Sequence, residues 1–201
     1  MAIDYSKMDR TPFDLPATLK HELCHLILHT EIQSSNLPKW LDEGVAQWAS
    51  GGIADIINPE NKDILKQAVL SGSLPPLNDI QRTFPAAHRG LILSYQESRS
   101  FIEFIVSEYG EDKLISIMHS LKSSLSIENA VLNNLGEELN MLEQKWRKNL
   151  VKKYSWPTYI ADHIYWILFF TAALITLTGY IMFRRRMRDY RDEEEEGFYE
   201  N

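Results

Sequence analysis

The stretch TLKHELCHLILHTEIQSSNLPKWLDEGVAQWAS, Thr18 to Ser50, decides how the rest of the chain is interpreted. It begins with an H-E-x-x-H run from His21 to His25. Side chains four residues apart lie on one face of a helix, so the run predicts two imidazoles directed at one metal ion. Glu22 lies beside them, where a carboxylate could accept a proton from water activated by the metal. Taken alone, the run also fits an ordinary amphipathic helix.

A second motif offers a third metal ligand, which a catalytic zinc site typically needs besides an open position for water. The segment Leu37 to Ala46, LPKWLDEGVA, contains Glu43. Pro38 suits the first turn of a helix, and the apolar residues that follow have helical spacing. The polar loop Thr30 to Asn36 is long enough to reverse the chain. We therefore expect two antiparallel helices, with Glu43 facing the histidine pair.

H-E-x-x-H followed by W-L-x-E-G resembles the gluzincin metallopeptidases, especially their aminopeptidase-N-like and peptidase MA-like members. The resemblance implies a zinc ion (Zn2+) bound by His21, His25 and Glu43, with Glu22 as the general base. It also implies a zincin-like, mainly α-helical catalytic domain and a peptide or protein substrate. The resemblance covers about Ala17 to Leu150.

A third informative stretch runs from Ser94 to Gly110, where Ser94 is predicted to cap a helix that ends at the glycine. In aminopeptidase-N-like enzymes a tyrosine opens the corresponding helix and donates a hydrogen bond to the oxyanion. The resemblance assigns this role to Tyr95. Glu97 and Ser98 stand where the family has a lysine and a glycine. An aromatic side chain that simply packs on the core remains the alternative for Tyr95.

Five other residues near these motifs have weaker signals. Cys24 is predicted to be a small buried hydrophobe rather than a ligand. His29 would lie about 12 Å along the helix from the first motif histidine, too far to share an ion with it. Asp42 and Gln47 are either solvated or hydrogen-bonded to the free ring nitrogen of a ligand histidine. His88 is expected in a solvated loop.

The remaining sequence up to Tyr154 reads as helices with apolar core stripes. The expected helices run from Asn58 to Gly72, from Leu77 to Phe84, from Glu111 to Lys122, from Ser126 to Gly136 and from Glu137 to Tyr154.

The start of the chain departs from the gluzincin pattern. Its first seventeen residues lack the apolar core of a signal peptide. They are also too few for the β-sheet that the family places before the H-E-x-x-H helix. We therefore expect a metallopeptidase domain over residues 1–155 with the upstream sheet missing, either because the start is internal to a longer gene product or because the chain is a reduced member.

A charge-free segment follows the domain. Ile164 to Phe183, IYWILFFTAALITLTGYIMF, contains twenty residues, enough for a helix to cross about 30 Å of hydrocarbon. We expect a single transmembrane helix over residues 160–184, anchored in a lipid bilayer. The arginines at its end and after it predict a cytoplasmic tail over residues 185–201 and an extracytoplasmic catalytic domain. These arginines are Arg184, Arg185, Arg186, Arg188 and Arg191.

Two classes of function compete. The first is a membrane-anchored zinc metallopeptidase, which the complete set of ligands and base favours. The second is an inactive or truncated zincin-fold module that binds a partner at the membrane, which the missing sheet favours. The formal net charge of −7 comes partly from an acidic run near the end of the chain and argues against a nucleic-acid partner.

Overall fold

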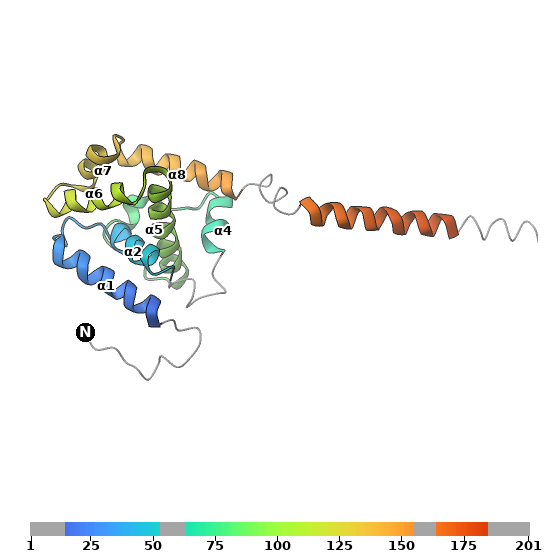
Figure 1. The fold of residues 1–201 in the computed structure, drawn as a ribbon, viewed down its shortest axis with the longest axis horizontal. Coiled ribbons are helices and arrows are strands. Elements are labelled where there is room, and N and C mark those ends of the chain that lie inside the picture. The colour runs from blue at the N-terminus through green and yellow to red at the C-terminus, as the bar shows by residue number, and fades with distance from the viewer. Residues whose placement is uncertain (1–14, 53–62, 155–163, 185–201) are drawn as a thin grey trace, which may run out of the picture. The chain divides into compact units, whose positions relative to one another are not determined.

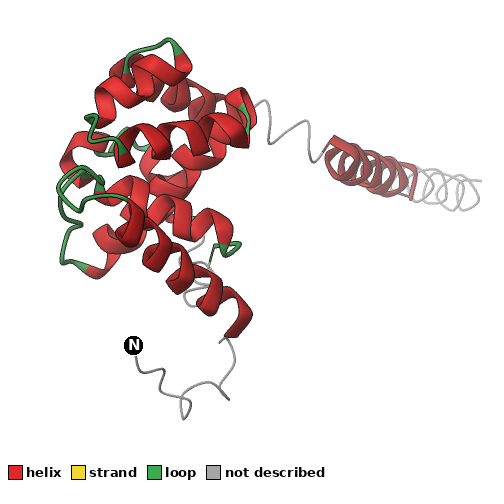
Figure 2. Cartoon of the chain, turned by 60° about the vertical axis from the view of Figure 1, so that its left-hand side comes forward, coloured by secondary structure: helices red, strands yellow, loops and turns green. Residues whose placement is uncertain are grey.

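The computed structural model describes residues 15–52, 63–154 and 164–184. The chain divides into two compact units, Met1–Tyr154 and Ser155–Asn201. The described residues form helices, turns and loops, and they contain no β-strand (Figure 2). The prediction of a mainly α-helical fold is therefore confirmed.

The described elements of the first unit are helices of different lengths (Figure 1). In chain order they are α1 (Leu15–Glu31), α2 (Lys39–Ala49), α4 (Ile64–Leu70), the 3-10 helix η3 (Leu77–Ile80), α5 (His88–Tyr109), α6 (Glu111–Lys122), α7 (Ile127–Leu135) and α8 (Leu139–Lys153). The predicted α6, α7 and α8 are confirmed within two residues at each end. The helix expected over 77–84 is confined to the four residues of η3, and the expected start of α4 at Asn58 lies outside the described residues.

Helix α2 lies at the centre of the first unit, packed against α5 and α1 (Figure 1). Eight of its 11 residues are buried, which is more than a single apolar face provides. Gly44 makes a close approach to α5, because a Cβ built there would lie only 2.7 Å from the carbonyl oxygen of Ser98. A glycine is therefore needed for α2 to lie this close to α5, and this packing holds the neighbouring Glu43 in place.

An aromatic chain connects three helices of the core. The ring of Trp40 on α2 meets Phe101 on α5 edge to face, with centroids 5.2 Å apart. Phe101 meets Trp146 on α8 in the same way at 5.3 Å. The indole Nε1 of Trp146 donates a hydrogen bond to Ser100 Oγ at 3.2 Å, which satisfies the one polar atom of that side chain. The apolar core stripe expected for the last helix of the domain is confirmed, because Leu142, Trp146 and Leu150 of α8 are buried.

Helix α5 begins earlier than predicted. Its first residue is His88, which is exposed and belongs to the helix rather than to a loop. Ser94 is not a cap: it lies in the second turn, and its Oγ donates to the carbonyl oxygen of Gly90 at 3.0 Å. The reason is that no breaker separates Gly90 from Tyr95, so the apolar residues there continue the helix. Tyr95 consequently lies inside α5 rather than at its opening.

Helix α1 is apolar on two sides. Its inner side buries Ala17, His21 and Leu28. Its outer side exposes four large apolar side chains at helical spacing: Leu19, Leu23, Leu26 and Ile27. Cys24 lies between the two sides and is only half-buried, so the prediction of a buried cysteine was wrong.

The second unit contains one described helix, Ile164–Arg184, of 21 residues. Its side chains are exposed along its whole length. By length and composition this helix could cross a membrane.

Candidate metal centre

The two motif histidines come from one face of α1. The Nε2 atoms of His21 and His25 lie 3.1 Å apart, and their rings meet edge to face. This is the arrangement expected for residues four apart on a helix. His21 is buried and His25 is partly buried, so both imidazoles point toward the body of the domain.

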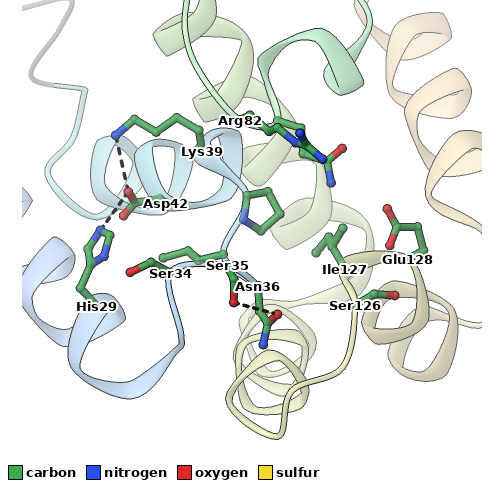
Figure 3. Close-up of a pocket in the computed structure, with 13 residues that line it drawn as sticks. His29, Ser34, Ser35, Asn36, Lys39, Asp42, Arg82, Ser126, Ile127 and Glu128 are labelled. Atoms are coloured by element: carbon green, nitrogen blue, oxygen red, sulfur yellow. Dashed lines mark hydrogen bonds and ion pairs between the residues drawn. The ribbon is translucent and has the colours of Figure 1, made fainter.

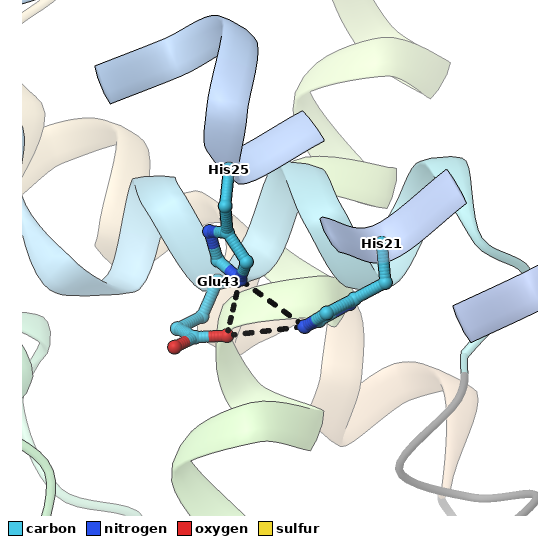
Figure 4. A group of neighbouring side chains, drawn as sticks. All are labelled: His21, His25 and Glu43. Atoms are coloured by element: carbon cyan, nitrogen blue, oxygen red, sulfur yellow. Dashed lines mark hydrogen bonds and ion pairs between the residues drawn. The ribbon is translucent and has the colours of Figure 1, made fainter. Parts of the chain in front are cut away.

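Glu43 reaches the same point from α2. Its Oε2 atom lies 3.4 Å from His25 Nε2 and 3.7 Å from His21 Nε2 (Figure 4). Three ligand atoms bound to one tetrahedral zinc ion lie about 3.3–3.5 Å apart, given bonds of about 2.0–2.2 Å. The three observed separations of 3.1, 3.4 and 3.7 Å fall on both sides of that value. The three atoms therefore fit one ion with small adjustments.

The carboxylate also has the unmet bonding capacity that a metal would use. Glu43 is buried, and its Oε2 accepts no hydrogen bond from any described residue. A buried carboxylate oxygen without a donor is costly, and a cation bound there would remove that cost. His21, His25 and Glu43 form a group of ligand atoms that lie within 4.8 Å of one another.

Asp42 orients one of the histidines. Its Oδ1 accepts a hydrogen bond from Nδ1 of His25 at 2.7 Å. A proton held on Nδ1 leaves the lone pair of Nε2 free to face the ion. The structure thus shows for Asp42 the contact that the sequence suggested. Gln47 is buried one turn further along α2.

The charges of the centre are strongly coupled. The hydrogen bond between His25 and Asp42, together with the nearby Glu43, raises the pKa of His25 to about 9. Burial lowers the pKa of His21, and so does the neighbouring His25. Burial alone would raise the pKa values of Glu43 and Asp42, but adjacent His25 and Lys39 outweigh it and hold both below their usual values. The two carboxylates are thus kept ionised next to the imidazoles.

Glu22 and Tyr95, for which the sequence suggested chemical roles, lie near the candidate ligands. Glu22 is half-buried on α1, close enough for its charge to raise the pKa of His21 against the effect of burial. Tyr95 is half-buried on α5, and its ring packs edge to face on Phe84 with centroids 5.3 Å apart. Burial raises the pKa of its hydroxyl, and the charge of Glu43 raises it further. The tyrosine therefore lies within electrostatic reach of the candidate ligand Glu43 while its ring packs on Phe84.

The chain matches the model of a known protein family. The family model described as the peptidase MA superfamily matches residues 15–152, which is more than half of the chain. The chain belongs to the peptidase MA superfamily. Searches of curated proteins and of solved structures found no match. The resemblance drawn from the two motifs is confirmed at the level of the superfamily, whose members generally depend on zinc.

This superfamily domain has a polar cavity beside the ligand group, with a volume of about 550 Å3. His29, Lys39 and Asp42 form one wall, and Arg82 and Glu128 also line it (Figure 3). His29 Nε2 lies 3.2 Å from Asp42 Oδ2, so His29 contacts the carboxylate that orients His25 and does not join the group around Glu43. The cavity therefore adjoins the candidate metal centre through Asp42.

The sequence did not single out Lys39, the first residue of α2. Its Nζ lies 2.7 Å from Glu43 Oε1 and 3.6 Å from Asp42 Oδ2. Residues four apart on a helix often form such pairs, so the spacing from Lys39 to Glu43 was the available signal. It was not decisive, because most pairs of this kind lie on solvated surfaces.

Proposed function

We propose that this member of the peptidase MA superfamily is a zinc-dependent metallopeptidase of the gluzincin type. The observation that supports the proposal is the convergence of His21 Nε2, His25 Nε2 and Glu43 Oε2, with separations of 3.1 to 3.7 Å. The two imidazoles and the carboxylate are the donor set that a hydrolytic zinc site uses. The substrates are peptides or proteins.

The division of labour follows from the chemistry of each side chain. A zinc ion held by the three ligands would polarise the substrate carbonyl and make water acidic enough to lose a proton near neutral pH. Glu22 accepts that proton and passes it to the leaving amine. Tyr95 donates a hydrogen bond to the oxygen on which negative charge develops. Asp42 keeps the proton of His25 on Nδ1.

We also propose that the enzyme is a single-pass membrane protein, anchored by the helix Ile164–Arg184. The length and composition of this helix support the proposal. The arginine cluster at its end favours a cytoplasmic tail, with the catalytic unit on the opposite side.

The Glu22→Gln variant tests the catalytic proposal. The amide has nearly the size of the carboxylate but is not a base, so hydrolysis of a fluorescently quenched protein substrate should fall by at least two orders of magnitude. Zinc content should stay equal to that of the wild type, because Glu22 is not a ligand. Turnover that persists in the variant would remove Glu22 from the role of base. A zinc-loaded wild-type protein without hydrolytic activity would favour a zincin-fold binding module instead.

A further inference from the structure

The two oxygens of Glu43 have different surroundings. Oε2 faces the imidazole nitrogens of His21 and His25, whereas Oε1 is paired with the ammonium of Lys39 at 2.7 Å. A glutamate without such a partner could bind an ion through both oxygens or rotate about its last side-chain torsion, which is soft. Here the lysine occupies the second oxygen and limits both possibilities.

The same ammonium group reaches the carboxylate that orients His25. Lys39 Nζ lies 3.6 Å from Asp42 Oδ2, while the other oxygen of Asp42 accepts the hydrogen bond from His25 Nδ1. One lysine therefore contacts both the candidate ligand Glu43 and the positioning residue Asp42.

A hydrogen bond within the fold holds the backbone of Lys39 in place. Its backbone N–H donates to the carbonyl oxygen of Gln81 at 2.7 Å, which joins the first turn of α2 to the segment after η3. Its side chain is 38% exposed, so the ammonium keeps some contact with water while it holds two buried carboxylates. An ion pair with a buried partner has more effect than one on an open surface.

We propose that Lys39 is a positioning residue of the zinc centre, which holds Glu43 so that Oε2 alone faces the ion and which steadies Asp42 behind His25. This inference rests on the proposed zinc centre and extends it to a residue that is not itself a metal ligand.

Charge and position predict opposite effects of removing the ammonium. If Lys39 acted only as a positive charge, its loss would relieve repulsion and tighten the binding of a cation. If it positions the carboxylates, its loss frees Glu43 and Asp42 to move and weakens binding. Residues that support metal ligands typically contribute about 10- to 100-fold to affinity.

The variant Lys39→Met keeps most of the length of the side chain and removes the charge, while Lys39→Arg keeps a cation within reach of both carboxylates. Lys113→Met is the matched control, because Lys113 is exposed on α6 and no residue of the ligand group lies on that helix. Zinc affinity is measured by competition with a chromophoric chelator on the full chain in detergent, and circular dichroism of the metal-free proteins checks that each variant folds. We expect about tenfold weaker zinc binding for Lys39→Met, recovery in Lys39→Arg and no change in the control.

Substitution with cobalt gives a second readout that general stability does not affect. When Glu43 is free to bind through both oxygens, the coordination number rises, and the visible bands of Co2+ weaken and shift. We expect this change in Lys39→Met and a spectrum like that of the wild type in Lys39→Arg. Equal or tighter zinc binding in Lys39→Met, or a cobalt spectrum identical to the wild type, would overturn the inference while leaving the zinc centre intact. A wild-type protein that binds neither metal would instead refute the proposed centre itself.

Discussion

The ring of Tyr95 packs on a neighbouring aromatic residue, and its hydroxyl lies near the candidate metal centre. Its ring packs on Phe84, and its hydroxyl responds to the charge of Glu43. Packing alone explains the first contact, while the second agrees with a donor aimed at the reacting carbonyl.

The Tyr95→Phe variant separates these two roles. It keeps the ring and removes the hydroxyl, so packing on Phe84 is retained. We expect kcat for peptide hydrolysis to fall on the order of one hundredfold, with little change in zinc content or in the thermal unfolding midpoint. A rate equal to that of the wild type would show that the Tyr95 hydroxyl has no role in catalysis and that the ring only packs on the core.

At the scale of residues, the sequence predicted that His21, His25 and Glu43 lie close together, because helical spacing is a strong geometric rule. His21 and His25 needed only a helix to bring them together, and Glu43 needed only the turn between two short helices. Lys39 was missed because a lysine four residues before a glutamate is common on solvated helices. Only the packing of α2 against α1 and α5 shows that its partners are buried.

At the scale of elements, the prediction failed where local signals competed. The segment before Tyr95 contains a serine that resembles a cap, yet α5 passes through it without a break. The serine was a misleading signal, because inside a helix the hydroxyl of Ser94 can donate a hydrogen bond to the carbonyl oxygen of Gly90. The start of α5 is marked instead by Ala87, whose backbone is extended (φ −65°, ψ 130°) just before the first helical residue.

Helix α5 also carries a carboxyl group that sequence alone would have placed on a surface. Glu97 is fully buried, and neither of its oxygens has a hydrogen-bond partner among the described residues. Arg147 on α8 lies 4.0 Å away, but it already binds Glu143 and the backbone carbonyls of Leu74 and Pro75. Burial raises the pKa of Glu97 to about 8, although the guanidinium opposes this effect.

This burial predicts a pH dependence of stability. Between the ordinary pKa of 4.5 and about 8, the folded protein keeps the proton of Glu97 while the unfolded chain releases it. The free energy of unfolding should therefore fall as the pH rises through that interval. In Glu97→Gln, which stays neutral, this part of the decrease should disappear. Urea unfolding of the metal-free protein at several pH values measures it, with exposed Glu128→Gln as the control. Parallel pH profiles for the wild type and Glu97→Gln would contradict the assignment.

At the scale of the whole molecule, we propose that water surrounds the first unit and that lipid surrounds the helix of the second unit. The first unit buries an aromatic core, whereas the helix Ile164–Arg184 exposes apolar side chains along its length. The length and composition of this helix could be read from the sequence. The side on which each unit lies depends on insertion, for which the arginine cluster is the available signal.

Labelling of single cysteines tests the orientation. In a Cys24→Ser background, one cysteine replaces Asn133, which is exposed on α7, and another replaces Glu200 in the tail. A membrane-impermeant maleimide added to intact cells should react at position 133 and not at position 200, because the arginines resist crossing the hydrocarbon. Both positions should react after the membrane is permeabilised. Reaction at position 200 alone in intact cells would reverse the topology and place the catalytic unit in the cytosol.

The most direct test of the account is the zinc content of the purified full chain. His21, His25 and Glu43 offer three ligand atoms within 4.8 Å of one another, so the wild type should contain about one zinc ion per chain. Each of His21→Ala, His25→Ala and Glu43→Ala should lose most of that metal, while Glu22→Gln should retain it. The wild type should also unfold at a lower temperature after treatment with a chelator, since metal bound only by the folded state stabilises it. Zinc content that is unchanged in His21→Ala or Glu43→Ala would contradict the central claim.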